Sequence, residues 1–289
     1  MKIWSVWLQG RNKAPKHVQK IFELWEELNP GSEFRVLENH DVNSILSELG
    51  ANFSRMTPQV KANITRTYLL ATYGGAWVDA TLFPTKPLES WLTPELRREG
   101  FFAFRSTGRP ELVLQNWFLY AAENNPLIKS WLSLYCDYFR IERYSQDSKR
   151  IFFSSHLFDY FRFNNATSRR DFLYFVDPER GRSCRRYPYA LHNYTLAYLL
   201  KTDKSLAELW GKVPVKFHVQ PSLVGYSAAD AETPDDVFLR LALDILPISP
   251  VHKLNHRDAR FDNLIDQAKS NGLIEFAEGR PLGHAGAVF

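Results

Sequence analysis

Four polar side chains within residues 57–81 have the types and the spacing of a binding site. Asn63 and Arg66 are three residues apart and would share one face of a helix. Asp79 and Thr81 are two residues apart and would point to the same side of a strand. A guanidinium suits phosphate oxygens, an amide suits hydroxyl groups, and a carboxylate beside a hydroxyl can hold a divalent cation. These four groups are predicted to converge around one glycine turn.

The local sequence predicts a helix and a strand that would position these groups. Thr57 is a favourable N-cap, Pro58 fits the first helical position, and apolar residues recur afterwards at helical spacing. Gly74-Gly75 ends this helix, because glycine takes the left-handed conformation without steric penalty. Residues 76–83 read as a strand in which Trp77, Asp79 and Thr81 point one way.

Earlier segments predict that the strand belongs to a parallel sheet. Residues 3–9 and 34–37 read as strands, and residues 14–28 and 41–49 as helices. Strand–helix alternation at this spacing indicates βαβ units, whose ligands bind at the carboxyl ends of the strands. Trp7 and Gln9 lie near the end of the first strand. Later segments are predicted as strands at 101–104 and 216–219 and helices at 126–139, 190–209 and 261–270.

The motif around Arg66 resembles the sugar-nucleotide site of GT-A glycosyltransferases. Its parts are Asn63-Ile64-Thr65-Arg66, Tyr73-Gly74-Gly75 and Asp79-Ala80-Thr81. The match is closest to the capsular polysaccharide synthesis family, and it is more distant to yeast-type initiating mannosyltransferases and clostridial glucosylating toxins. The resemblance implies an α/β fold with a GT-A-like, Rossmann-type mixed sheet flanked by helices and helical additions in the C-terminal half. It covers most of residues 1–256 and is specific around residues 66–81.

The resemblance also implies a set of residues that bind the nucleotide sugar. Trp7 would stack on the nucleotide base, although an inward-facing core residue is the other interpretation. Asn116 would bind the sugar or help to hold a metal, with an ordinary buried amide as an equal alternative. The full set is Trp7, Gln9, Asn63, Arg66, Gly75, Asp79, Asn116 and Lys253.

A divalent cation, Mn²⁺ or Mg²⁺, is expected between Asp79, Thr81 and His252. The segment Val251-His252-Lys253-Leu254 is similar to a tail motif of the capsular family, in which a histidine returns to the metal and a lysine meets the diphosphate. One imidazole among oxygen ligands favours Mn²⁺. Two residues depart from the family pattern: Asn63 stands where relatives carry Asp, and Thr81 stands where a second Asp is commonest.

The residues that would bind the acceptor are less clearly indicated by the sequence. His156 and Asp159 resemble residues of a family helix that would line an acceptor pocket, although a lone histidine on an aromatic helix is more often structural. Arginines are densest just beyond this segment, and they predict either a solvated face or contact with a phosphate-bearing acceptor or anionic lipid headgroups. They are Arg169, Arg170, Arg180, Arg182, Arg185 and Arg186.

Composition agrees with a globular enzyme. The 289 residues are 45% hydrophobic and carry a net charge of +4, which is too weak to indicate nucleic-acid binding. We expect a transferase domain over residues 1–256, with the sugar-donor site mainly in 1–122 and the acceptor part mainly in 123–256, and a helix and flexible tail over 257–289. No apolar run approaches the ~20 residues of a membrane span. The chain reads as cytoplasmic, with peripheral contact at the inner face of the plasma membrane as a further expectation.

The predicted function is metal-assisted transfer of a sugar from a nucleoside diphosphate sugar to a hydroxyl of a surface or lipid-linked glycan. No catalytic base is identified from the sequence. Two other interpretations stay open: a catalytically silent module that binds nucleotide sugars or glycans, and a different metal-dependent enzyme of phosphate esters. The second lacks a phosphate-cradling glycine loop and another acidic cluster.

Overall fold

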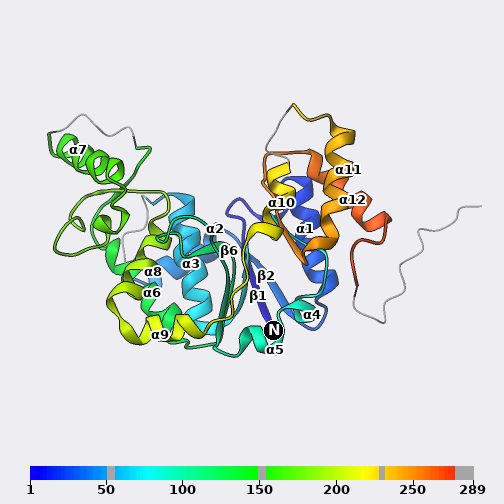
Figure 1. Cartoon of the computed structure of the whole chain (residues 1–289), viewed down its shortest axis with the longest axis horizontal. Helices are drawn as coiled ribbons and strands as arrows, with labels where there is room; N and C mark the ends of the chain where they lie inside the picture. The colour runs from blue at the N-terminus through cyan, green and yellow to red at the C-terminus, as the bar shows by residue number, and fades with distance from the viewer. Residues whose placement is uncertain (51–55, 149–153, 228–231, 277–289) are drawn as a thin grey trace, which may run out of the picture. The chain divides into compact units, whose positions relative to one another are not determined.

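The computed structural model describes residues 1–50, 56–148, 154–227 and 232–276, and only the backbone of residues 154–156. The described chain divides into two compact units (Figure 1). Unit 1 comprises Met1–Ala14, Arg35–Asp79 and Pro94–Val219; unit 2 comprises Pro15–Phe34, Ala80–Thr93 and Gln220–Phe289. The boundary expected between residues 256 and 257 does not coincide with a unit boundary, because α12 (Arg260–Ser270) packs on α11 (Asp235–Ile245) and α1 (Lys16–Leu28) within unit 2.

A mixed five-stranded sheet in the order β2-β1-β3-β6-β5 forms the centre of unit 1. Strand β3 runs parallel to β1 and antiparallel to β6, and β5 runs antiparallel to β6. The predicted α/β fold with a mixed sheet flanked by helices is confirmed. The strands are β1 (Lys2–Val6), β2 (Glu33–Leu37), β3 (Gly75–Val78), β5 (Phe101–Arg105) and β6 (Leu114–Ala121).

Helix α3 packs against the sheet through contacts with β1, β3 and β6, and against α2 and α6 (Figure 1). Thr57 caps it as predicted, since its hydroxyl accepts a hydrogen bond from the Val60 backbone N–H at 3.3 Å. The major helices of unit 1 are α2 (Asn39–Glu48), α3 (Pro58–Tyr73), α6 (Pro126–Tyr138), α7 (Ser154–Ser168), α8 (Leu191–Thr202) and α9 (Lys204–Lys212). Its short elements are η1 (Arg11–Lys13), α5 (Pro94–Arg97), η3 (Phe172–Phe175) and the parallel strands β7 (Tyr144–Ser145) and β8 (Arg186–Tyr187).

Unit 2 is built around the antiparallel strands β4 and β9 and the helices that cover them. Helix α1 packs on β4, and Trp25 of α1 donates a hydrogen bond through Nε1 to the Leu82 carbonyl at 2.8 Å. The elements of unit 2 are α1 (Lys16–Leu28), β4 (Leu82–Pro84), α4 (Leu88–Trp91), α10 (Val219–Ser227), α11 (Asp235–Ile245), η4 (Leu246–Ile248), β9 (Val251–Lys253) and α12 (Arg260–Ser270).

Three predicted elements differ from the structure. The single strand expected at 76–83 is two strands in different sheets, because the chain leaves β3 after Val78 and resumes extended structure at Leu82. The helix expected at 190–209 is divided at Asp203, whose side chain caps α9. The strand expected at 216–219 was wrong: only Phe217 forms an isolated bridge there, and α10 begins at Val219.

Candidate functional site

The polar centre of unit 1 is an ion pair between Arg66, on α3, and Asp79, just after β3. Arg66 donates a hydrogen bond through Nη2 to Asp79 Oδ1 at 3.0 Å. Trp77 donates through Nε1 to the same oxygen at 3.0 Å, and its ring centroid lies 4.9 Å from the guanidinium carbon of Arg66. Trp77 and Asp79 therefore share one side of the strand, as the sequence predicted. One carboxylate oxygen orients two N–H donors, and the tryptophan ring lies beside the cation.

Arg66 is held almost completely inside unit 1. The residue is 6% exposed, and its Nη1 donates to the Asn116 carbonyl oxygen at 2.6 Å. Burial lowers the pKa of Arg66, while the charge of Asp79 acts in the opposite direction. Two nearby buried atoms, Arg66 Nε and Asn116 Oδ1, have no hydrogen-bond partner among the described residues. Because such atoms cost free energy of about 1–3 kcal/mol each, a polar ligand that paired with them would be favoured.

The interior beside Arg66 is polar but uncharged. Asn63, one turn earlier on α3, donates a hydrogen bond to the hydroxyl of the buried Tyr135 at 3.4 Å. His192 of α8 stacks on Trp131 with ring centroids 4.0 Å apart and meets Tyr135 edge-on at 4.7 Å. Burial and the charge of Arg66 lower the pKa of His192 well below its ordinary value, so the imidazole stays neutral. Arg66 therefore supplies the positive charge of this interior.

Sequence reasoning missed Tyr135 and His192 as parts of this polar interior. Both lie on helices that read as ordinary packing helices. The available signal was the spacing of Tyr135, four residues after Trp131, which places the two rings on one helical face. Nothing in the local sequence indicated that His192 faces them.

A small, largely enclosed pocket of about 80 Å³ opens at the first turns of α3, next to Asn63. Most of its lining residues carry hydroxyl, amide or carboxylate groups, which suit a ligand rich in hydroxyl groups. Tyr189 is 67% exposed, and its backbone N–H donates to Gln146 Oε1 at 2.9 Å. No local sequence pattern predicted this wall, which is formed by the ends of β7 and β8 and the residues just after them. The lining residues are Thr57, Gln59, Val60, Asn63, Ser145, Gln146, Asp147, Tyr187 and Tyr189.

Trp7 and Gln9 follow β1 at the edge of the sheet where Asp79 follows β3. The two strands are parallel neighbours, with Ile3 opposite Ala76, so their carboxyl ends lie at one edge. Trp7 is half-buried and Gln9 is exposed in the turn. Both positions are compatible with the predicted contact with a nucleotide.

The structure explains why position 75 requires glycine, which the motif alone did not reveal. Its φ is +100°, and a Cβ atom there would lie 2.3 Å from the Lys2 carbonyl oxygen. Only glycine accepts this φ together with so close an approach of β1 and β3. The structure thus gives Gly75 a role in sheet packing, separate from ligand binding.

Thr81 and Lys253 meet within unit 2. Lys253 Nζ donates a hydrogen bond to Thr81 Oγ1, and the Leu254 backbone N–H donates to the Thr81 carbonyl at 2.9 Å. Strands β4 and β9 pair antiparallel, with Leu82 opposite Lys253. The C-terminal segment therefore returns to the chain just after the Asp79 motif, as the resemblance implies, and it brings an ammonium group to Thr81.

His252, by contrast, lies in the interior of unit 2. It is fully buried, and its Nε2 lies 3.0 Å from the Leu246 carbonyl oxygen and 2.9 Å from that of Ser249. Two carbonyl acceptors require Nε2 to carry the proton. Burial lowers the pKa of His252 to about 4. Neighbouring strand residues point to opposite faces, so the contact of Lys253 with Thr81 places His252 on the other face of β9.

Each of the three expected metal ligands is already engaged within its own unit. Oδ1 of Asp79 already accepts from two N–H groups, the Thr81 hydroxyl accepts from an ammonium, and His252 faces away from Thr81. Within the described part of the chain, no cluster of three or more His, Cys, Asp or Glu side chains could hold a metal ion. We therefore derive no step through a metal, and the cation stays a prediction for experiment.

The two acceptor candidates lie on α7. The side chain of His156 is outside the described residues. Asp159 is partly buried, and its charge acts on Arg143 and Arg162. Asp159 thus belongs to the arginine-rich part of unit 1. Among the described residues, no contact joins it to Arg66 or Asp79.

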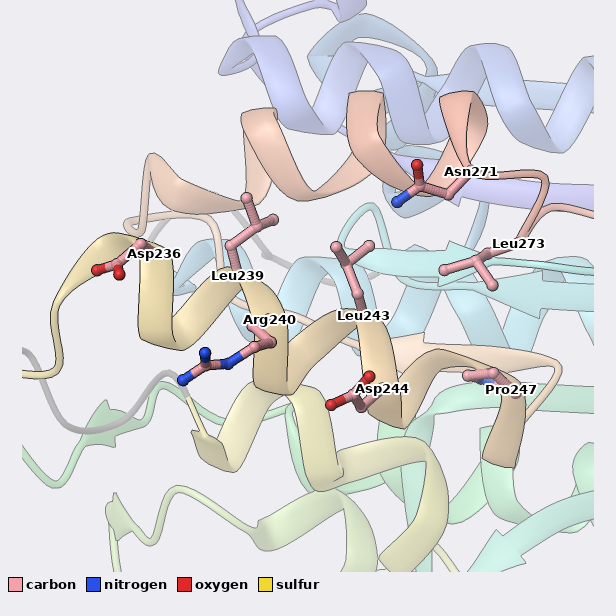
Figure 2. A pocket seen from close by; sticks show the side chains of 8 residues that line it. All are labelled: Asp236, Leu239, Arg240, Leu243, Asp244, Pro247, Asn271 and Leu273. Carbon is pink, nitrogen blue, oxygen red and sulfur yellow. The ribbon is translucent and has the colours of Figure 1, made fainter.

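A larger, open hollow of about 550 Å³ lies on unit 2 beside α11 (Figure 2). Leucine and proline side chains line it together with Arg240, Asp236 and Asp244, and Figure 2 shows the charged groups pointing outward from α11. None of the residues predicted from the motifs lines this hollow. Separately, none of the helices in the described ranges is both long and apolar enough to cross a bilayer.

Comparisons with known proteins found a matching family, two curated relatives and a similar solved structure. The family described as "Capsular polysaccharide synthesis protein" matches residues 1–177. "Putative glycosyltransferase HOC1" of Saccharomyces cerevisiae is 29% identical over 106 residues, which are 32% of this chain and 25% of that protein. "O-glycosyltransferase braB" of Annulohypoxylon truncatum is 29% identical over 152 residues, which are 46% and 36% of the two chains. The chain thus matches about a third or less of the length of these relatives.

Among solved structures, "PaToxG Glycosyltransferase" is similar with a TM-score of 0.36 and 14% identity, covering 73% of this chain and 74% of that one. The family match is the firmer result, because residues 1–177 are more than half of the 289 residues and include Trp7, Asn63, Arg66, Asp79 and Asn116. The chain belongs to the capsular polysaccharide synthesis protein family.

Proposed function

We propose that the chain transfers a sugar from a nucleoside diphosphate sugar to a hydroxyl group of a capsular or other surface glycan. The observation that carries this proposal is the buried Arg66, which is fixed by Asp79 and lies one helical turn from Asn63, a residue that lines a pocket with hydroxyl and amide groups. A single cation one helical turn from a pocket-lining amide suits a ligand that joins a charged diphosphate to an uncharged sugar. Membership of the family and the names of the two curated relatives support glycosyl transfer as the reaction class.

Each residue has a role that its chemistry supports. During transfer the bond from the anomeric carbon to the diphosphate oxygen breaks, a bond to the acceptor oxygen forms, and the proton of the acceptor hydroxyl passes to the departing diphosphate. Negative charge grows on the departing diphosphate, and a preorganised guanidinium such as Arg66 stabilises it without reorganisation. Asp79 and Trp77 hold that guanidinium in place. Asn63 and its pocket would bind sugar hydroxyls, while Trp7 would stack on the base.

Lys253 is proposed as a second cation for the diphosphate. Its ammonium is already hydrogen-bonded to Thr81, so part of its conformational freedom is lost before a ligand arrives. The acceptor is proposed to be a glycan, free or linked to a lipid.

A binding screen followed by a transfer assay tests the proposal. UDP-, GDP- and CMP-sugars are added with Mn²⁺ or with a chelator, and the melting temperature is measured. A ligand at a hundred times its dissociation constant stabilises the folded state by about 2.7 kcal/mol. We expect one nucleotide sugar to raise the melting temperature of the wild type. Arg66→Gln and Asn63→Ala should lose this increase. Arg240→Gln, which changes an exposed residue of unit 2, should retain it.

The competing proposal is a catalytically silent module that binds nucleotide sugars or glycans. Asn63 and Thr81 motivate it, because an amide and a hydroxyl replace the carboxylates that are common at these positions. Radiolabelled sugar appearing in a glycan acceptor would eliminate this alternative. Binding of a nucleotide sugar without transfer to any glycan tested would instead favour it over the enzyme.

A further inference from the structure

Helix α7 presents large apolar side chains outward from unit 1. Leu157, Phe158 and Phe161 are 44%, 64% and 62% exposed, and their spacing places them on one face of the helix. On the opposite face, Phe163 and Ala166 are buried where α7 packs on η3 and β8. The exposed face is therefore separate from the face that holds α7 to the unit. We call Leu157, Phe158 and Phe161 the apolar face of α7.

Arginines lie beside the apolar face of α7 and at the C-terminal end of the helix. Arg162 lies one residue after Phe161, with its guanidinium carbon 5.6 Å from the centroid of the Phe158 ring. Arg169 and Arg170 are exposed at the end of the helix. Residues 157–186 contain seven arginines and four acidic residues, a net charge of +3. Local charge and exposed apolar surface thus occur together.

Part of this charge is compensated within the unit. Arg180 pairs with Asp171, and Arg182 pairs with Asp137. Arg169, Arg170 and Arg185 are exposed, and no ion pair joins them to another described residue. These three cations are the ones left to meet an anionic partner.

We propose that α7 docks the protein on an anionic phospholipid surface, with Phe158 and Phe161 entering the headgroup boundary and the arginines meeting lipid phosphates. Helices that lie in a membrane interface combine aromatic and aliphatic residues on one face with arginine or lysine beside it. Anionic leaflets attract such basic segments within about one Debye length. Charge complementarity favours a lipid surface over a neutral glycan, which would not use the cations. The proposal does not depend on the reaction that Arg66 serves.

Vesicle co-sedimentation of the full chain tests this docking. Vesicles of phosphatidylcholine alone are compared with equal mixtures of phosphatidylcholine and phosphatidylglycerol, at low and at high salt. We expect binding to the anionic vesicles that weakens as salt rises. Phe158→Ala with Phe161→Ala should weaken it roughly ten-fold or more, because two rings no longer enter the boundary. Arg169→Gln with Arg170→Gln should weaken it on the order of twenty-fold.

Matched controls separate this surface from general stickiness. Phe217→Ala removes a ring that is 56% exposed elsewhere on unit 1, and Arg240→Gln with Arg257→Gln makes the same charge change on unit 2. Both controls should bind as the wild type does, and all variants should melt as the wild type does because the changed side chains are exposed. Equal binding to both kinds of vesicle, equal loss in the controls, or no binding to either vesicle would overturn the proposal. So would binding of the α7 face to a protein or glycan partner without any lipid binding.

Discussion

Arg66 and Asp79 form a 3.0 Å ion pair whose two members differ sharply in exposure. The Arg66 side chain is 7% exposed, whereas the Asp79 side chain is 27% exposed. Removal of the carboxylate would leave a buried cation without its counter-charge. Removal of the arginine would leave a carboxylate that water can still reach.

This asymmetry predicts unequal effects on stability. Asp79→Asn should lower the free energy of unfolding by about 2–4 kcal/mol, because breaking a buried pair leaves an uncompensated charge. Arg66→Met should cost less, since Asp79 keeps its bond from Trp77 and gains water. Urea unfolding of both single variants and of the double variant measures the two effects and their coupling. A larger loss for Arg66→Met than for Asp79→Asn would contradict this account.

Gly75 predicts a strong effect of a single methyl group. Gly75→Ala would place Cβ 2.3 Å from the Lys2 carbonyl oxygen at a φ of +100°, so β1 and β3 must separate. We expect the free energy of unfolding to fall by several kcal/mol, which is more than the ~1 kcal/mol that a left-handed conformation alone costs.

Gly50→Ala is the matched control for that change. Its φ is +66° and no atom of the described residues lies within 4 Å of the added Cβ, so this variant reports the cost of the left-handed conformation by itself. Thermal unfolding of the two variants separates the effect of the Cβ contact with the Lys2 carbonyl from the effect of the left-handed backbone conformation. Similar melting temperatures for both would refute the close-approach explanation.

Local patterns were sufficient for α3, its Thr57 cap and the strand that delivers Asp79, because each depends on neighbours in sequence. They were insufficient where the structure depends on pairing between segments that are far apart in the sequence. Residues 76–83 read as one strand, yet Leu82 pairs with Lys253 in another sheet, which no short window can reveal. The motif assigned His252 to a metal-ligand position, but the alternation of side chains along β9 directs it toward the core of unit 2. The wall of Gln146 and Tyr189 beside Asn63 likewise depends on contacts across more than 80 residues.

Asn63 predicts an effect on catalysis with the fold retained. Asn63→Ala removes an amide that lies in the pocket and bonds Tyr135, so we expect kcat/KM to fall about 10- to 100-fold, which is 1.4–2.7 kcal/mol of lost transition-state binding. Asn63→Asp introduces a carboxylate in place of the amide and should change the preference among sugars more than the overall rate. Steady-state kinetics over a panel of donors measures both variants. Unchanged kcat/KM in Asn63→Ala would remove Asn63 from the site.

His252 predicts how the stability of unit 2 depends on pH. Burial lowers its pKa from 6.5 to about 4 in the folded protein, whereas the unfolded chain keeps the ordinary value. Between these two values the unfolded chain binds more protons than the folded chain, so stability falls as pH falls. The loss is complete below the folded pKa and amounts to at most about 3 kcal/mol. His252→Gln retains a side-chain N–H donor for the Leu246 and Ser249 carbonyls but does not titrate. Denaturant unfolding from pH 7 to pH 4 should therefore show a shallower decline for His252→Gln than for the wild type, and parallel declines would show that His252 does not take up the proton that unfolds this unit.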